Sequence, residues 1–191
     1  MRLFFAVLSP CFLAAGLVLA GLPGGSSADD RASTGTIKLE SLKWTQFKER
    51  LAAGNGAKFT LVDVWATTCG PCKENFPHLV EMHRKYGGGK GLAVISLTLD
   101  DPTDAKAVAA AEKFLQEKKA VFTNVLLDEN YGDGFDKLDI NTIPAVFLFG
   151  PDGKEKKRFT MDDTRHQFTY EQVEKEVVAL LEGTQPKGPE K

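Results

Sequence analysis

The feature that most constrains the fold is a regular alternation between short apolar runs and helix-forming segments. Four runs rich in Val, Leu, Ile and Phe have the length of buried strands: 59–65, 92–99, 121–127 and 145–149. A turn at 150–153 leads into a fifth strand near 155–161. Helical periodicity and helix-terminating glycines predict five helices: 41–53, 69–86, 102–119, 132–138 and 169–183. This order predicts an α/β fold in which helices flank a central mixed sheet.

Capping residues mark the starts of several of these helices. Ser41 is expected to cap the first helix, and Pro102 is expected at the first position of the third, after the cap residue Asp101. Thr169 and Gln172 have the spacing of a capping box at the start of the last helix.

The N-terminal segment differs from the rest of the chain. Arg2 precedes an almost entirely apolar run at 3–20, and a Gly, Pro and Ser-rich stretch follows. This pattern is typical of a signal peptide at 1–28, cleaved after Ala28 or after Ala20, and it predicts an exported, periplasmic or extracytoplasmic protein. A core helix and an uncleaved membrane anchor are the alternatives. We further expect a flexible tether at 29–36, a folded domain at 37–183 and a disordered tail at 184–191.

Charge and cysteine content narrow the function. The net charge of −2 gives no reason to expect nucleic acid as a partner, because phosphate binding requires a concentrated basic surface. The chain has three cysteines, and Cys11 would be removed with the signal peptide. The remaining pair, Cys69 and Cys72, is too closely spaced for a disulfide framework. A single close pair outside the cytoplasm therefore points to redox chemistry.

The pair lies in Cys69-Gly70-Pro71-Cys72, at the point where a strand ends and a helix begins. Unpaired N–H groups at a helix start favour negative charge, so the Cys69 thiolate should be stabilised and act as the nucleophile. Cys72 lies one turn further into the helix, where it can reach Cys69 but not a substrate. We therefore expect Cys69 to attack a substrate disulfide and Cys72 to resolve the mixed disulfide.

Zinc binding is the competing interpretation of a Cys-x-x-Cys sequence. Zinc requires about four ligands, and the chain has no second cysteine pair. The only histidines are His78, His83 and His166, and neither His78 nor His83 has a ligand spacing from the cysteines. We expect neither a metal nor another cofactor.

The residues around the cysteines resemble a known family. The segment 62–73, Val-Asp-Val-Trp-Ala-Thr-Thr-Cys-Gly-Pro-Cys-Lys, is similar to the active-site segment of the thioredoxin superfamily. Pro77 matches the proline inside the active-site helix of that family, and Pro144 matches a cis-proline beside the cysteines. Asp63 matches a buried acid that assists proton transfer to the resolving cysteine.

The resemblance implies a catalytic role for Asp63 beside the two cysteines. A carboxylate in an apolar strand should have a raised pKa, as a general acid or base requires, although a strand-end acid that reaches solvent is the alternative. A cis bond before Pro144 would leave the Ile143 backbone free to pair with an extended substrate, whereas an ordinary trans turn is the alternative. The expected substrate-binding residues are Trp65, Gly70, Pro71, Ile143 and Pro144.

The spacing of elements indicates a subgroup. Plain thioredoxins have one strand and one helix between the active-site helix and the cis-proline, whereas this chain has an additional helix–strand unit. The insertion, the export signal and Trp65-Ala66-Thr67 resemble the TlpA/ResA group of extracytoplasmic thiol–disulfide oxidoreductases, which often serve cytochrome c maturation. That resemblance implies protein thiols and disulfides as substrates, a membrane electron donor and a monomer. The Gly-Pro dipeptide between the cysteines implies a reductase.

Two positions depart from the thioredoxin pattern. Thr68 replaces a tryptophan that precedes the first cysteine, and Ser96 stands where thioredoxin has a lysine near the buried acid. These changes leave the partner specificity and the pH dependence of the reaction open.

Two other functions remain as alternatives: a copper or haem-delivery chaperone that uses the cysteines as ligands, and a peroxidase of the peroxiredoxin-related group.

Overall fold

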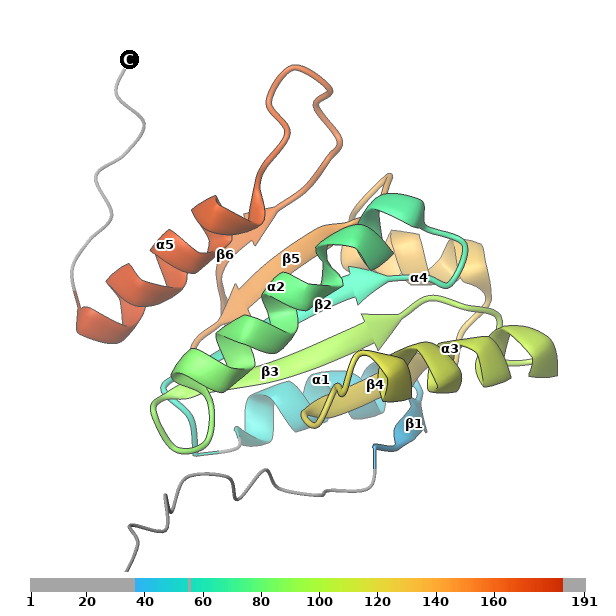
Figure 1. The fold of residues 1–191 in the computed structure, drawn as a ribbon, viewed down its shortest axis with the longest axis horizontal. Coiled ribbons are helices and arrows are strands. Elements are labelled where there is room, and N and C mark those ends of the chain that lie inside the picture. The colour runs from blue at the N-terminus through green and yellow to red at the C-terminus, as the bar shows by residue number, and fades with distance from the viewer. Residues whose placement is uncertain (1–36, 55, 184–191) are drawn as a thin grey trace, which may run out of the picture. The chain divides into compact units, whose positions relative to one another are not determined.

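The computed structural model describes residues 37–54 and 56–183, and it shows a six-stranded sheet with helices on both faces (Figure 1). The predicted signal peptide, tether and tail lie outside the described residues. The strands are β1 (Leu39–Leu42), β2 (Phe59–Trp65), β3 (Leu92–Thr98), β4 (Thr123–Leu127), β5 (Ala145–Phe149) and β6 (Glu155–Phe159). The helices are α1 (Trp44–Ala53), α2 (Gly70–Tyr86), α3 (Ala105–Glu117), α4 (Tyr131–Leu138) and α5 (Tyr170–Glu182). The predicted α/β thioredoxin fold is confirmed.

The sheet has the strand order β1-β4-β3-β2-β5-β6. The first four strands in this order are parallel, and β5 runs antiparallel to both β2 and β6. The stretch between α2 and β5 contains β3, α3, β4 and α4, as the expected additional helix–strand unit requires. Because β2 is central, the residues that follow it lie at the carboxyl end of the parallel strands, where α/β proteins collect their chemistry.

Two layers of apolar side chains hold the helices against the sheet. Alternate residues of β2 point to opposite faces, so Leu61 and Trp65 belong to one core while Val62 and Val64 belong to the other. Residues of α2, α3 and α5 pack into the first core, and residues of α1 and α4 pack into the second. Figure 1 shows α2 and α5 in front of the sheet, with α1 and α4 behind it.

Two predicted helix starts were wrong. Ser41 lies in β1, where it pairs with Leu126 of β4, and α1 begins after Lys43. The third helix begins after Asp104, whose carboxylate accepts hydrogen bonds from two backbone N–H groups, so Pro102 lies in the preceding turn. The capping box of Thr169 in α5 is confirmed.

The two edges of the sheet differ in length and charge. β1 has four residues, whereas β6 presents four successive exposed charged side chains, at positions 155–158.

Within the described ranges 37–54 and 56–183, no helix combines the length and the apolar character that crossing a bilayer requires.

Candidate active site

The two cysteines lie at the start of α2 and form a disulfide. Cys69 is the N-cap residue and is partly exposed, whereas Cys72 is fully buried. The backbone N–H of Cys72 donates a hydrogen bond to the Cys69 sulfur at 3.2 Å. In the reduced protein this N–H would stabilise a negative charge on that sulfur, in addition to the effect of the helix start. The arrangement suits an outer nucleophile and an inner resolving thiol.

The loop before β5 lies against the outer cysteine. The bond between Ile143 and Pro144 is cis, as the family resemblance implied, and the Ile143 carbonyl oxygen lies 3.8 Å from the Cys69 sulfur. Pro71 and Gly70 are exposed beside this loop, and Pro144 is buried. The loop that contains the cis bond therefore places the Ile143 carbonyl next to the sulfur of Cys69, although the two residues are 74 positions apart in the sequence.

A groove of about 430 Å³ extends from this point along the surface. One wall is formed by Pro71 and the cis-proline loop, and the other by residues of the loop between β6 and α5, including Met161 and Asp162. The Asp162 carboxylate accepts a hydrogen bond from the Asn141 backbone N–H at 3.0 Å, which joins the two walls. An extended peptide that carries a disulfide could lie in this groove with its sulfur at Cys69.

Asp63 is fully buried in β2, so the alternative of an acid that reaches solvent is wrong. Burial raises the pKa of Asp63 from 3.8 to about 7, and a hydrogen bond from Tyr170 acts in the opposite direction. The Tyr170 hydroxyl donates to Oδ1 at 2.6 Å, while Oδ2 has no hydrogen-bond partner within the described part of the chain. Because Asp63 shares a face of β2 with Leu61 and Trp65, its carboxyl lies on the side of the sheet that α2 covers.

Ser96 is the strand neighbour of Asp63 on β3. Its hydroxyl donates a hydrogen bond to the side-chain oxygen of Asn124 at 2.8 Å, so both polar groups have a partner inside the sheet. Burial raises the pKa of Asp63 and the hydrogen bond from Tyr170 partly opposes that rise, and neither effect involves a cation. With serine at position 96 in place of the lysine of thioredoxin, the pKa of Asp63 is therefore about 7.

The structure corrects one predicted site residue. Trp65 was expected at the substrate surface, but its side chain is 0% exposed and packs against Phe76 and Phe114 at ring distances of 5.4 and 5.0 Å. The strand alternation directs it into the core beneath α2. Trp65 therefore packs beneath the helix that carries the cysteines, and its side chain does not line the groove.

Sequence reasoning missed Asp100, which anchors the segment before Cys69. Asp100 is buried, and its carboxylate accepts hydrogen bonds from the Thr67 backbone N–H at 3.0 Å and the Thr67 hydroxyl at 2.6 Å. The Thr98 hydroxyl donates to the other oxygen at 2.6 Å. The available signal was the position of Asp100 just after β3, at the same sheet end as the cysteines. Tyr170 was also missed, since no local pattern connects it with a residue 107 positions earlier.

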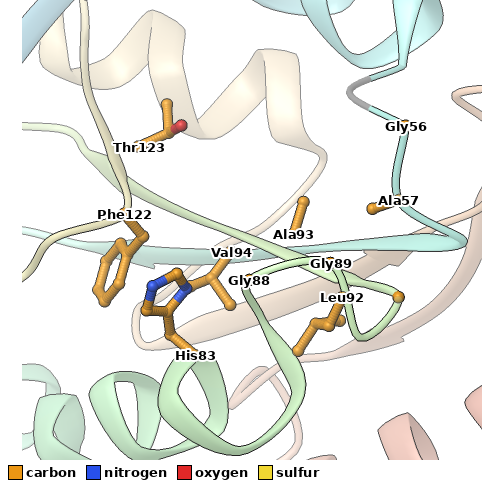
Figure 2. Close-up of a pocket in the computed structure, with 11 residues that line it drawn as sticks. Gly56, Ala57, His83, Gly88, Gly89, Leu92, Ala93, Val94, Phe122 and Thr123 are labelled. Carbon is orange, nitrogen blue, oxygen red and sulfur yellow. The ribbon is translucent and has the colours of Figure 1, made fainter. Parts of the chain in front are cut away.

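A second cavity, of about 270 Å³, lies at the start of β3 and β4 and includes Gly88 and Gly89 (Figure 2). His83 of α2 stands there beside Phe122, with the ring centroids 5.3 Å apart. Burial lowers the pKa of His83. This cavity contains none of the predicted site residues.

Across residues 37–54 and 56–183 we find no group of three or more His, Cys, Asp or Glu side chains placed to hold a metal ion.

Relatives with named activities are similar to this chain. Thiol-disulfide oxidoreductase ResA from Bacillus subtilis is 23% identical over 150 residues, which cover 78% of each chain. ResA from Bacillus thuringiensis subsp. konkukian is 28% identical over 110 residues, which cover 58% of this chain and 59% of that relative. Sporulation thiol-disulfide oxidoreductase A from Bacillus subtilis is 24% identical over 140 residues, which cover 73% of this chain and 81% of the relative.

Solved structures and a family model complete the comparison. A thioredoxin-like protein in its oxidised form has a TM-score of 0.54 at 21% identity, over 72% of this chain and 85% of that one. A thioredoxin-like protein from Neisseria meningitidis has a TM-score of 0.52 at 17% identity, over 69% and 80% of the two chains. These two matches show the fold. The sequence model of the AhpC/TSA family matches residues 32–158. The chain therefore belongs to the AhpC/TSA family and is a thiol–disulfide oxidoreductase with a thioredoxin-like fold.

Proposed function

We propose that this protein reduces disulfides of protein substrates outside the cytoplasm, with Cys69 as the nucleophile and Cys72 as the resolving thiol. The observation that carries the proposal is the asymmetry of the pair: Cys69 is partly exposed at the helix start beside the groove, and Cys72 is fully buried behind it. Only Cys69 is accessible to a sulfur in the groove.

The proposed reaction has two exchange steps. The Cys69 thiolate attacks one sulfur of a substrate disulfide, forming a mixed disulfide and releasing the other sulfur as a thiolate that takes a proton from water. Asp63 accepts the proton of Cys72, and the Cys72 thiolate then attacks the Cys69 sulfur. The bond between Cys69 and the substrate breaks, and the second substrate sulfur leaves as a thiolate that takes up the proton from Asp63. Two electrons have passed to the substrate, and the protein ends as the Cys69–Cys72 disulfide.

The groove beside the cis-proline loop is the proposed substrate site. Gly70 and Pro71 leave one side of Cys69 uncovered, and Ile143 and Pro144 form the other side. An extended substrate could pair with the Ile143 backbone as an added strand while its sulfur reaches Cys69. This mode requires few specific side chains, so we expect several protein substrates.

The direction of electron flow and the location rest on sequence resemblance. The Gly-Pro dipeptide implies a reductase, and the apolar segment at 3–20 implies export or an uncleaved anchor. A membrane-bound electron donor would then return two electrons to the disulfide after each cycle. We expect the protein to act as a monomer.

Trapping experiments test the proposal. In cells that express the chain from its native start, Cys72→Ser should accumulate mixed disulfides through Cys69, and the matched Cys69→Ser variant should accumulate none. A redox potential near that of thioredoxin, about −270 mV, supports a reductase, whereas one near about −120 mV would make the protein an oxidant. The absence of trapped partners, together with a pair that cannot be reduced reversibly, would refute the catalytic role of the cysteines.

Two assays address the other functions. Peroxide consumption at the rate of thiol peroxidases would replace the reductase with a peroxidase. Stoichiometric Cu(I) binding that abolishes thiol reactivity would favour a metal chaperone, because soft thiolates are the ligands that Cu(I) prefers.

A further inference from the structure

The Tyr170 hydroxyl forms the one side-chain hydrogen bond to Asp63 within the described residues. Tyr170 is the first residue of α5 and is 3% exposed. Its ring stacks on His78 with the centroids 5.7 Å apart, and the ring of Phe168 lies at the same centroid distance from it. The capping box of Thr169 fixes the helix start from which this side chain extends. The ring contacts and the capped helix start therefore hold the Tyr170 hydroxyl at Asp63.

This bond makes the two carboxyl oxygens of Asp63 unequal. Oδ1 accepts the Tyr170 O–H at 2.6 Å, a distance typical of a hydrogen bond to an ionised acceptor. Oδ2 is buried and has no hydrogen-bond partner within residues 37–54 and 56–183. A proton that arrives at Asp63 is therefore accommodated on Oδ2, because Oδ1 is already occupied by a donor.

We propose that Tyr170 is a positioning residue for proton transfer: its hydroxyl fixes the Asp63 carboxyl and stabilises its charged form, so that Oδ2 can take the proton of Cys72. The proposal rests on the role of Asp63 proposed above. In the step it assists, the S–H bond of Cys72 breaks and the proton moves to Oδ2. The resulting thiolate attacks the Cys69 sulfur, the bond from Cys69 to the substrate breaks, and the substrate leaves as a thiolate that takes up the proton from Oδ2. Tyr170 keeps its own proton throughout, since burial raises its pKa well above the usual value.

The surroundings of Asp63 contain few other titratable groups. Its strand partners are Ser96 on β3 and Val146 on β5, neither of which titrates. On the α2 side, Cys72 belongs to the same apolar core as Tyr170, and His78, which stacks on the Tyr170 ring, is exposed. Loss of the Tyr170 hydroxyl should therefore change the ionisation of Asp63 directly.

The experiment compares Tyr170→Phe with the wild type in a two-step reaction with an aromatic disulfide reagent whose released thiolate absorbs visible light. The first release reports the attack by Cys69, and the second reports the attack by Cys72 on the mixed disulfide. We expect the pH profile of the second step to move to higher pH by about one unit, the contribution of one hydrogen bond to a charged group. At pH 7 the second step should then be about fivefold slower, and the first step should be unchanged.

Two further variants separate the possible outcomes. Tyr86→Phe removes a tyrosine hydroxyl that bonds Glu174 on the surface between α2 and α5, and it should leave both steps unchanged. In an Asp63→Asn background, Tyr170→Phe should have no further effect on the second step.

An equal slowing with and without Asp63, or a normal pH profile in Tyr170→Phe, would refute the role of Tyr170. A second step that Asp63→Asn does not slow would instead refute the proposed role of Asp63. An absent first step in the wild type would refute the proposed function itself.

Discussion

Replacing Asp63 by asparagine should make the stability of the oxidised protein depend less on pH. The native protein keeps Asp63 protonated up to a pKa of about 7, while the unfolded chain releases that proton near 3.8. Between these values the native state binds one more proton, so the free energy of unfolding falls as the pH rises. Below 3.8 and above about 7 the contribution of Asp63 no longer changes with pH.

The size of the effect follows from the two pKa values. Each pH unit between them lowers the stability by about 1.4 kcal/mol, so the whole interval accounts for about 4 kcal/mol. The side chain introduced by Asp63→Asn is neutral at every pH, and its oxygen can still accept the Tyr170 hydroxyl. Its NH2 group would occupy the place of the unpartnered Oδ2, at a cost of about 1–3 kcal/mol that does not vary with pH. The variant should therefore be the less stable protein near pH 4 and the more stable one near pH 8.

Urea unfolding of both oxidised proteins, at pH values from about 4 to 8.5, measures this difference. The disulfide prevents the cysteines from titrating, and subtraction cancels the groups that the two proteins share. A stability difference that stays constant across this range would show that Asp63 is ionised in the folded protein well below neutrality. The desolvation argument would then fail.

Three other changes test separate parts of the site. Asp100→Ala should lower the free energy of unfolding by about 3 kcal/mol in a urea titration, because three hydrogen-bond donors lose their acceptor, whereas loss of the exposed cap in Asp104→Ala should cost about 1 kcal/mol. Trp65→Ala should cost about 3–5 kcal/mol by the same measurement, and a cost below about 1 kcal/mol would contradict its buried position. In the reduced protein, brief alkylation followed by mass spectrometry should modify Cys69 and spare Cys72, and equal modification would contradict the asymmetry of the pair.

The sequence predicts the central part of this fold because local patterns determine it. Mostly apolar runs mark β2, β3 and β5, and the cysteine segment marks the start of α2. The family resemblance identified Asp63, and the structure shows that this acid is fully buried in the central strand. The family resemblance supplied Pro144, whose cis bond the structure contains.

The parts that sequence did not predict depend on distant contacts. The segment of β1 has no β-branched residue, and it becomes a strand by pairing with β4, far along the chain. Tyr170 and Asp100 carry no local mark of their roles, because each acts on a residue distant in the sequence. Trp65 was misplaced because family resemblance was given more weight than the alternation of β2, which sends its side chain into the core.

The charged edge strand β6 has a consequence for the proposed pairing of an extended substrate with this protein. Open sheet edges can recruit extended segments and so become templates for aggregation. Four successive charged residues on β6 oppose such recruitment, because a strand added there would have to displace their hydration. The opposite edge, β1, is four residues long and offers little length for pairing. The proposed backbone pairing with a substrate is thereby confined to the short stretch at Ile143, beside the sulfur of Cys69.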